Sequence, residues 1–242
     1  MALAAALAFA PAQAFAAPAT DISGHWAEKV ITQWQEKGLI SGYEDGTFKP
    51  DNSVTRAEFV IMLNKALGFT QKGNVTFSDV SANAWYYDAV AIAVEAGYCA
   101  GYEDGTFKPN ATITRAEAAV MIAKAKELTA NTEAADKFTD ASRIPVWAKG
   151  SVGAVSAAGF MTGRTDGTFD ATNTITRAEA VSSLDRTMEK EETDEEAKDV
   201  VVTEDDTVIE GQTIEGNLII DKAVGEGEVY VNDTTVKGNV IV

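Results

Sequence analysis

The chain has 242 residues, enough for one large or two small domains, and its formal net charge of −17 argues against nucleic acid as a partner. The single cysteine, Cys99, excludes an intrachain disulfide, and the single histidine, His25, argues against a zinc site or a histidine-based catalytic triad. The acidity is uneven, because residues 188–242 hold 16 acids and 4 bases whereas residues 1–187 hold 21 acids and 16 bases. The longer part therefore keeps enough basic side chains to hold an anion locally.

The first residues have the pattern of a secretory signal. Residues 2–10 form an apolar run, and Ala-Phe-Ala at 14–16 gives a cleavage pattern of small residues, although the basic region that usually comes first is missing. A transmembrane helix is the weaker interpretation, because the run is short and is followed by Pro11 and Gln13. We therefore predict a signal peptide over residues 1–17 and a secreted protein.

The strongest pattern that follows is a threefold internal repeat. Gly-Tyr-Glu-Asp-Gly-Thr-Phe-Lys-Pro stands at both 42–50 and 101–109, and Gly-Arg-Thr-Asp-Gly-Thr-Phe-Asp-Ala stands at 163–171. Each copy is followed by Thr-Arg-Ala-Glu, and the phenylalanine precedes the arginine by the same number of positions every time. These copies predict three repeats, over residues 18–75, 76–135 and 136–188.

Each repeat reads as helix, loop and helix. The first helices should begin near a tryptophan and end at a glycine, the residue preferred just past a helix end: Trp26 and Gly38, Trp85 and Gly97, Trp147 and Gly159. The second helices should begin with a capping box, in which a threonine is followed three positions later by a glutamate: Thr55 and Glu58, Thr114 and Glu117, Thr176 and Glu179. The phenylalanines of the loops should fill the core: Phe48, Phe107 and Phe169.

A single helical hairpin cannot bury its own apolar face, whereas three similar hairpins packed together can. We therefore predict a mainly α fold in which the three repeats form a pseudo-threefold bundle. An acidic linker over residues 189–200 should follow, and then a β-repeat segment over residues 201–242. The segments 213–220 and 235–242 match with an offset of 22 residues and alternate β-forming residues, which predicts coils of a β-solenoid that continues past Val242.

The repeated motifs resemble the S-layer homology domain, a family found in bacterial surface proteins. Gly-Tyr-x-Asp-Gly-Thr-Phe-x-Pro followed by Thr-Arg-Ala-Glu carries the resemblance over about residues 20–188, and an aspartate ahead of each tryptophan adds to it. The resemblance implies a three-lobed spindle with grooves between the repeats. It also implies that these grooves bind secondary cell-wall polysaccharide, which often carries a ketal-linked pyruvate on N-acetylmannosamine.

The same resemblance implies the candidate glycan-binding residues. The arginine of Thr-Arg-Ala-Glu contributes to the grooves, and it corresponds to Arg56, Arg115 and Arg177. To these we add the aspartates, tryptophans and leading glycines of the three copies: Asp21, Asp79, Asp140, Trp26, Trp85, Trp147, Gly42, Gly101 and Gly163. The third copy departs from the pattern at Arg164 and at Asp170-Ala171, so its groove is expected to bind more weakly or to be only structural.

The chemistry of the residues supports an anion site independently of the resemblance. Each arginine is placed at the first turn of a capped helix, where unpaired N–H groups and the helix dipole favour an anion, and its guanidinium fits a carboxylate such as that of a pyruvyl ketal. The alternative is that each arginine pairs with an acid of the neighbouring repeat, for example Asp21 or Asp79. Tryptophan at helical spacing is more often a core residue than a sugar platform, and the glycines either serve only the turn or allow a ligand to approach the backbone.

We thus predict non-covalent anchoring of a secreted surface or S-layer protein to the cell wall, through anionic, pyruvylated secondary cell-wall polysaccharide. Peptidoglycan is a second candidate partner, and the protein is also a candidate for self-assembly in an S-layer. No cofactor or metal is expected. The chain is predicted not to be an enzyme, because its acids lack catalytic context and it has no nucleophile elbow. The alternative is a targeting module of a wall-active enzyme whose catalytic part lies beyond Val242. The sequence argues against a calcium-binding EF-hand, because alignment on Gly46 puts Ser41 and Tyr43 at ligand positions.

Overall fold

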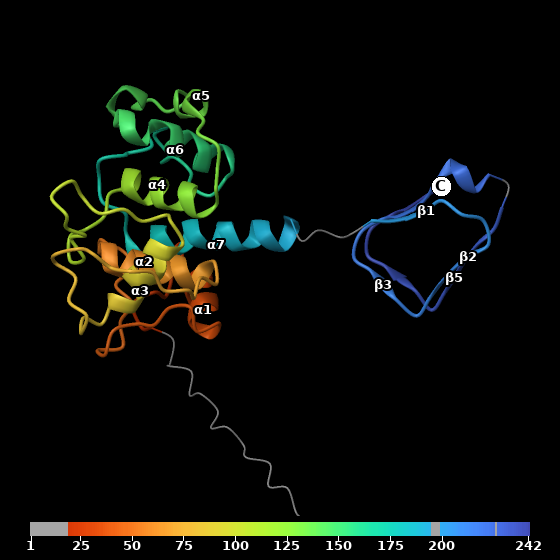
Figure 1. Cartoon of the computed structure of the whole chain (residues 1–242), viewed down its shortest axis with the longest axis horizontal. Helices are drawn as coiled ribbons and strands as arrows, with labels where there is room; N and C mark the ends of the chain where they lie inside the picture. Colours follow the sequence, from red (N-terminus) through yellow and green to blue (C-terminus); the bar gives the residue numbers. More distant parts are fainter. Residues whose placement is uncertain (1–18, 195–198, 226) are drawn as a thin grey trace, which may run out of the picture. The chain divides into compact units, whose positions relative to one another are not determined.

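The computed structural model describes residues 19–194, 199–225 and 227–242, which form two compact units divided between Thr187 and Met188. The first unit is mainly helical, and the second consists of small parallel sheets (Figure 1). The predicted signal peptide, 1–17, lies outside the described residues. Among the residues that are described, no helix is both long and apolar enough to cross a bilayer.

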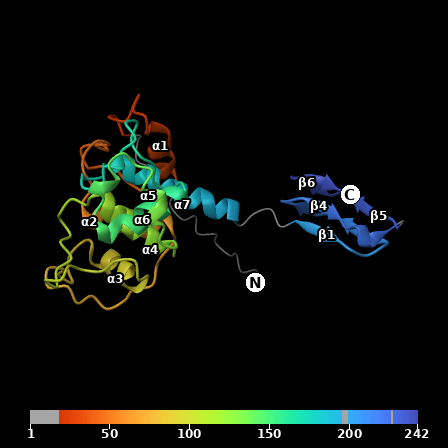
Figure 2. The same cartoon turned by 90° about the horizontal axis from the view of Figure 1, so that it is seen from above.

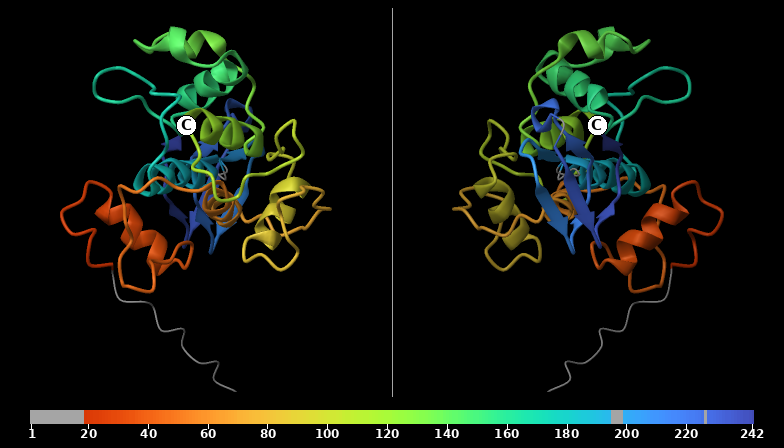
Figure 3. Two further views of the ribbon diagram at one scale, coloured as in Figure 1. Left: turned by 90° about the vertical axis from the view of Figure 1, so that its left-hand side faces the viewer. Right: turned by 90° about the vertical axis from the view of Figure 1, so that its right-hand side faces the viewer.

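The helical unit contains a pair of main helices from each repeat. The elements in chain order are α1 (Glu28–Glu36), α2 (Arg56–Ala66), α3 (Tyr87–Glu95), α4 (Arg115–Ala125), α5 (Thr132–Ala135), the 3-10 helix η1 (Ala141–Arg143), α6 (Val146–Ala157) and α7 (Arg177–Asp194). The helices α1, α3 and α6 begin close to the predicted tryptophans. Figure 3 shows α1, α3 and α6 at the periphery of this unit, with α2, α4 and α7 between them.

The helix ends follow from local sequence as predicted. The residue just past the C-cap of α1, α3 and α6 is Gly38, Gly97 and Gly159, with φ values of 69°, 74° and 79°, a left-handed conformation that glycine adopts without steric cost. Complete capping boxes start α2 and α4. Thr176 and Glu179 exchange the same two hydrogen bonds at the start of α7. Each repeat thus defines its own helix boundaries within a few residues of chain.

Packing, in contrast, joins each repeat to the next. The first helix of the second repeat, α3, packs against α2 of the first repeat, and α6 of the third repeat packs against α4 of the second. The third contact of this kind joins the first repeat to the third, because Trp34 Nε1 of α1 donates to Asp185 Oδ1 of α7 at 2.8 Å. Every first helix therefore contacts the second helix of the repeat that precedes it in a cycle.

The centre of the unit is a ring of three backbone hydrogen bonds. Val54 N donates to Ile175 O, Ile175 N to Ile113 O and Ile113 N to Val54 O, each at 3.1 Å. All three side chains are fully buried. The three loop phenylalanines are also buried, as predicted, and so is an apolar stripe of each second helix: Phe48, Phe107 and Phe169 in the loops, and Phe59, Val60, Leu63, Ala118, Ala119, Ile122, Ala180, Val181 and Leu184 in the helices.

The second unit is built from short parallel strands. Its elements are β1 (Val200–Val202), β2 (Thr207–Glu210), β3 (Thr213–Ile214), β4 (Leu218–Ile220), the 3-10 helix η2 (Lys222–Val224), β5 (Val229–Asn232), β6 (Thr235–Val236) and β7 (Val240–Ile241). The strands pair as β1-β4-β7, β2-β5 and β3-β6, and Figure 2 shows β1 and β4 side by side. A small core holds Val202, Ile209, Ile214, Leu218 and Val224.

The register of these strands agrees with the 22-residue offset seen in the sequence, since Thr213 pairs with Thr235 and Leu218 with Val240. The acidic segment before the strands is partly helical, because α7 continues through Asp194. The rest of that segment, residues 195–198, lies outside the described residues.

Candidate functional site

Three pockets of the helical unit repeat the same composition. Each combines an arginine from one repeat, a glycine and a glutamate from the next repeat, and a tryptophan from the remaining one. The Arg56 pocket contains Gly101, Glu117 and Trp147, the Arg177 pocket contains Gly42, Glu58 and Trp85, and the Arg115 pocket contains Gly163, Glu179 and Trp26. Their cavity volumes are about 630, 190 and 420 Å³, respectively.

The arginine of each pocket holds two repeats together. Arg56 Nε donates to Phe107 O at 2.9 Å, and Arg56 Nη1 lies 3.1 Å from Glu117 Oε1. The guanidinium also lies 4.8 Å from the centre of the Tyr102 ring, a cation–π distance. Only 4% of the residue is exposed, although it forms part of the pocket wall.

The other two arginines make the same kind of contacts. Arg177 donates to Phe48 O and Glu58 Oε1, both at 2.9 Å. Arg115 donates to Phe169 O at 2.8 Å and to Thr162 O at 2.9 Å. The acid that pairs with each arginine belongs to a neighbouring repeat, but it is the capping-box glutamate and not the aspartates that the sequence suggested as examples. Among the described residues, none accepts a hydrogen bond from Nη2 of Arg56 or Arg177, so these donors remain for a ligand.

In the described residues, the first backbone N–H groups of α2, α4 and α7 all have partners, contrary to the expectation for these helix N-termini. At the start of α2, Arg56 N donates to Ala111 O and Ala57 N to Pro109 O, both at 3.0 Å, while Glu58 N donates to Thr55 Oγ1. Carbonyl groups of neighbouring repeats satisfy the corresponding N–H groups of α4 and α7 at 2.9 Å. The prediction of unpaired N–H groups was wrong, because packing between repeats supplies partners that a single helix lacks.

Glu117 of the Arg56 pocket stays ionised at neutral pH in spite of its partial burial. Burial acts to raise the pKa of Glu117, but hydrogen bonds from Thr114 N and Tyr102 Oη, together with the Arg56 charge, outweigh it and hold the pKa below 4.5. Burial and the same hydrogen bond to Glu117 raise the pKa of Tyr102 to about 12. The pocket wall therefore carries a stable arginine–glutamate pair and a neutral tyrosine at neutral pH.

The three aspartates clamp the backbone of the loops. Asp79 Oδ1 accepts from Phe107 N at 2.7 Å and Asp79 Oδ2 from Lys108 N at 2.8 Å. Asp21 and Asp140 hold the corresponding amides of the other loops. The clamped residue after each phenylalanine has a left-handed φ, 57° at Lys108. None of the three aspartates belongs to the three pocket walls described above, so their contact with a glycan stays a prediction, and their observed contacts are structural.

The tryptophans lie at the surface and not in the core. Trp26, Trp85 and Trp147 are 63%, 67% and 62% exposed, so the general preference of tryptophan for burial does not hold here. Each of them is part of a pocket wall, which is where a sugar platform would be needed. Spacing alone could not show this, because the apolar face of α1 is completed by Ile31 and Trp34, which are fully buried.

The leading glycines serve the loop backbone and also belong to the pocket walls. A Cβ at Gly42 would lie 2.7 Å from Thr47 O, and one at Gly163 would lie 2.7 Å from Phe138 Cε1. Either contact is too short for a side chain, so glycine is required for the loop itself. Outside the pockets, Cys99 is buried, and burial raises the pKa of its thiol to about 11, in agreement with an apolar role.

The profile of the S-layer homology domain matches residues 20–60, 76–119 and 137–181, together more than half of the chain. The chain belongs to the S-layer homology domain family. This domain is a non-catalytic anchoring module, and membership places the chain at the bacterial cell surface or cell wall. The three matches coincide with the three repeats whose residues build the pockets.

Three relatives show how this family is used. The Surface-layer 125 kDa protein of Lysinibacillus sphaericus is 37% identical over 142 residues, which are 59% of this chain and 12% of that protein. The Cellulosome-anchoring protein of Acetivibrio thermocellus is 34% identical over 159 residues, 63% of this chain and 36% of that protein. Exoglucanase XynX of the same organism is 35% identical over 176 residues, 70% of this chain and 16% of that protein. The chain thus spans only a minor part of the length of these relatives.

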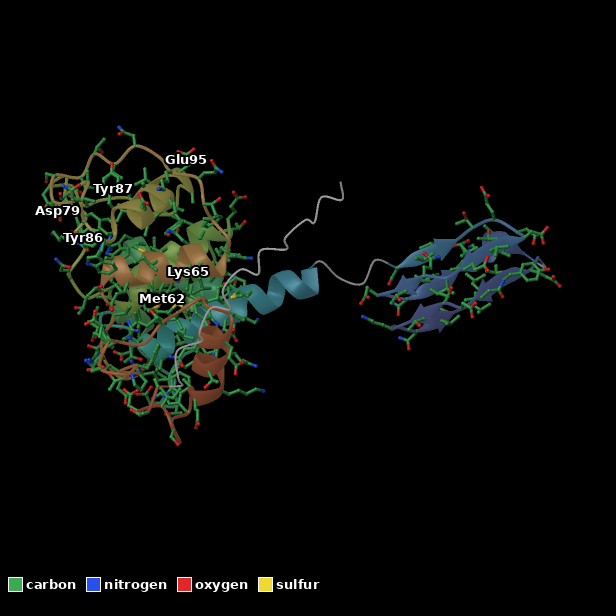
Figure 4. The ribbon with its side chains drawn as sticks, turned by 90° about the horizontal axis from the view of Figure 1, so that it is seen from below. Met62, Lys65, Asp79, Tyr86, Tyr87 and Glu95 are labelled. Atoms are coloured by element: carbon green, nitrogen blue, oxygen red, sulfur yellow. The ribbon has the colours of Figure 1, made fainter. Side chains whose placement is uncertain are left out.

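The S-layer homology motifs did not reveal every residue of the pocket walls. The motifs contain Tyr43 and Tyr102, but they assign no role to either tyrosine. In the structure both belong to pocket walls, and Tyr102 Oη donates to Glu117 Oε1 at 2.7 Å. The second helices contribute the positions three, four and seven after the glutamate: Ile61, Met62 and Lys65 in α2, Val120, Met121 and Lys124 in α4, Ser182, Ser183 and Arg186 in α7. Helical spacing from the glutamate was the signal that could have found them. Figure 4 labels Met62 and Lys65 on α2.

Proposed function

We propose that the chain anchors a surface or S-layer protein non-covalently to the cell wall, by binding anionic, pyruvylated secondary cell-wall polysaccharide in the three pockets. One observation carries the proposal: every pocket joins an exposed tryptophan to an arginine whose other contacts already fix its position. An aromatic face suits the apolar side of a sugar ring, and a fixed guanidinium suits a carboxylate. The pockets are therefore suited to an acidic sugar.

Three pockets on one unit match a polymer of repeating units. A single sugar contact is weak, since a charge-assisted hydrogen bond contributes only about 1.5–3 kcal/mol. Simultaneous binding of two or three pockets to one glycan chain raises the overall affinity by ~10²-fold or more without any new contact. Anchoring by several weak sites also explains how attachment can be firm without a covalent bond.

We also propose that the repeats, with the boundaries 18–75, 76–135 and 136–188, form a pseudo-threefold bundle. The cyclic backbone ring of Val54, Ile113 and Ile175 and the three cyclic arginine contacts support it. The parallel register with a 22-residue offset supports the interpretation of residues 201–242 as coils of a β-solenoid. In this proposal the helical unit alone carries the glycan sites.

A second candidate function is the targeting of a wall-active enzyme by the same module. The names of several relatives favour it, among them exoglucanase XynX of Acetivibrio thermocellus and the Amylopullulanase of Thermoanaerobacterium thermosulfurigenes. We propose that the present chain itself binds without catalysis in either case. Incubation with labelled walls separates binding from hydrolysis, because only hydrolysis releases soluble labelled fragments.

The test of glycan binding is a pelleting assay of the full chain with purified walls, before and after removal of the pyruvyl groups by mild acid. The variant Trp85→Ala/Trp147→Ala removes two exposed rings and should lower the affinity for intact walls by about tenfold or more, while folding is retained. Val146→Ala is the matched control, because Val146 is 94% exposed and belongs to none of the three pocket walls. If the double tryptophan variant pellets like its parent, the pockets do not bind the wall.

Arginine variants are less suitable for this assay than the sequence suggested. Arg56 and Arg115 are both 4% exposed and hold the loop carbonyls of Phe107 and Phe169. Their replacement by alanine would leave buried polar groups unpaired and would lower the stability of the unit. A loss of binding by Arg56→Ala/Arg115→Ala could then reflect unfolding, which the tryptophan variants avoid.

A further inference from the structure

The three pockets differ at equivalent positions of their walls. Counted from the capping-box glutamate, the third, fourth and seventh following residues are apolar, apolar and lysine in two pockets, but Ser182, Ser183 and Arg186 in the Arg115 pocket. The loop tyrosine of the other pockets is Arg164 here. Three wall positions have therefore changed from aromatic or apolar to polar side chains, and the lysine at the fourth position has become an arginine.

The polar groups of the Arg115 pocket are held in place. Arg164 Nε donates to Asp170 Oδ2 at 2.6 Å and Arg164 Nη1 to Glu179 Oε1 at 3.0 Å. Arg186 donates to Phe160 O and to Ser182 Oγ, both at 3.1 Å. No described residue accepts a hydrogen bond from Arg164 Nη2, and the Ser182 hydroxyl, which accepts from Arg186, can still donate its own proton. The wall thus offers fixed donors to a polar ligand.

Net charge does not distinguish the Arg115 and Arg56 pockets when the whole loop of each, 163–171 and 101–109, is counted with its wall. The wall and loop of the Arg115 pocket hold three cations and three anions: Arg115, Arg164, Arg186, Asp166, Asp170 and Glu179. Those of the Arg56 pocket hold the same number of each: Arg56, Lys108, Lys124, Glu103, Asp104 and Glu117. The difference lies in hydrogen bonding and apolar contact, and so it concerns the substituents of the sugar more than its charge.

Apolar and polar walls select different substituents. Burial of one methyl group against an apolar wall strengthens binding by about fourfold. A methyl group placed against Ser182 and Ser183 would gain less, because it would also separate the two hydroxyls from water. Conversely, a hydroxyl placed against Val120 and Met121 would lose its own hydrogen bonds.

We propose, on the basis of the glycan-binding function above, that the three pockets bind two kinds of sugar unit. The Arg56 and Arg177 pockets bind a unit whose contacting edge carries a methyl-bearing substituent, such as an N-acetyl group or a ketal. The Arg115 pocket binds a unit whose contacting edge has only hydroxyl and carboxylate groups. The third repeat is then a binding site of altered specificity, and not a weakened copy.

Each pocket contains its own reporter for the test. The chain has four tryptophans, of which Trp26, Trp85 and Trp147 belong to different pockets and Trp34 is fully buried. The full chain labelled with 5-fluorotryptophan therefore gives a 19F resonance for each pocket and one that monitors folding. The two probes are pyruvyl-ketal N-acetylmannosamine methyl glycoside and glucuronic acid methyl glycoside.

The ketal probe should shift the Trp85 and Trp147 resonances at a concentration about tenfold lower than it shifts that of Trp26, and the glucuronide should show the reverse order. Ser182→Val/Ser183→Met should move the response of Trp26 to the ketal probe toward that of Trp147. If Ser183→Met disturbs the Trp34 resonance, the reverse variant Val120→Ser in the wider Arg56 pocket replaces it, and it should weaken the response of Trp147 to the ketal probe.

Three results are informative. Equal midpoints of all three pocket resonances with each probe, together with binding to walls, would overturn the altered specificity and leave the anchoring function intact. Unchanged probe preferences in both swap variants would do the same. If no pocket resonance moves with either probe and the chain does not pellet with walls, the glycan-binding function itself fails.

Discussion

The loops of the second and third repeats, 101–109 and 163–171, share a backbone but not their side chains. Asp79 Oδ1 holds Phe107 N at 2.7 Å, and Asp140 Oδ1 holds Phe169 N at 2.8 Å. The residue after the phenylalanine is left-handed in both loops, with φ of 57° in one and 61° in the other. The backbone frame is thus conserved between two loops whose exposed sequences differ.

The side chains on this frame form two different arrangements. In the second repeat, the Tyr102 ring contacts both a lysine and an arginine, with Lys108 Nζ 4.1 Å and Arg56 Cζ 4.8 Å from the ring centre. In the third repeat, Arg164 makes an ion pair with Asp170 in the position of that lysine. Both Tyr102 and Arg164 donate to the capping-box glutamate of their own repeat. The side chains of the loop therefore differ in pairs between the two repeats, while the same aspartate clamp holds the backbone of both loops.

The largest expected effect on stability follows from removal of the aspartate clamp. Asp79→Ala should lower the free energy of unfolding by about 3 kcal/mol, because two charge-assisted hydrogen bonds to backbone N–H groups are lost. Asp140→Ala should have a similar effect, since its loop uses the same clamp. Urea denaturation followed by circular dichroism measures both.

The control for the clamp is Asp88→Ala, which removes a surface ion pair with Lys72 and an exposed acid from the first turn of α3, and it should change the free energy of unfolding by less than about 1 kcal/mol. If Asp79→Ala were as stable as this control, the shared frame would have another origin.

A smaller effect tests whether the two side-chain arrangements are compensating pairs. Arg164→Tyr removes the ion-pair partner of Asp170, and Asp170→Lys places a second cation beside Arg164, so each change should cost about 1 kcal/mol. The double variant restores the arrangement of the second repeat and should recover most of the loss.

A double-mutant cycle measures this coupling and cancels the hydrogen bond that Asp170 also accepts from Asn173 Nδ2. Strictly additive single effects would show that the two positions changed independently.

The smallest effect concerns acid. Because the pKa of Glu117 in the folded state is below its ordinary 4.5, the folded state binds fewer protons there, and this contribution to stability is present above pH 4.5 and is lost as the pH falls through the folded pKa. Tyr102→Phe removes one of the hydrogen bonds that lower this pKa.

The loss of unfolding free energy between neutral pH and about pH 3 should therefore be smaller in Tyr102→Phe than in the parent. Urea denaturation at the two pH values measures the difference. An unchanged loss would mean that the tyrosine does not stabilise the ionised glutamate.

Local features of this protein were determined by its sequence. Helix starts such as Thr55 with Glu58, helix ends such as Gly38, and the burial of Phe48 were all predicted correctly. The start and the end of a helix each depend on residues only a few positions apart in the chain. The burial of Phe48 follows from its apolar side chain at a position that recurs in every repeat. The family and its three copies were determined in the same way, because a long motif repeated at regular intervals needs no knowledge of contacts.

The roles of the arginines and tryptophans depend on contacts between repeats, which the sequence does not show. Arg177 reaches Phe48 O across 129 positions of chain, and the N–H groups of α2 are satisfied by carbonyls of another repeat. The exposure of Trp147 and its place in the same pocket as Arg56 depend on how three repeats meet. A repeat period shows that the units are alike, but not which unit faces which, and every pocket here is built from side chains of all three repeats.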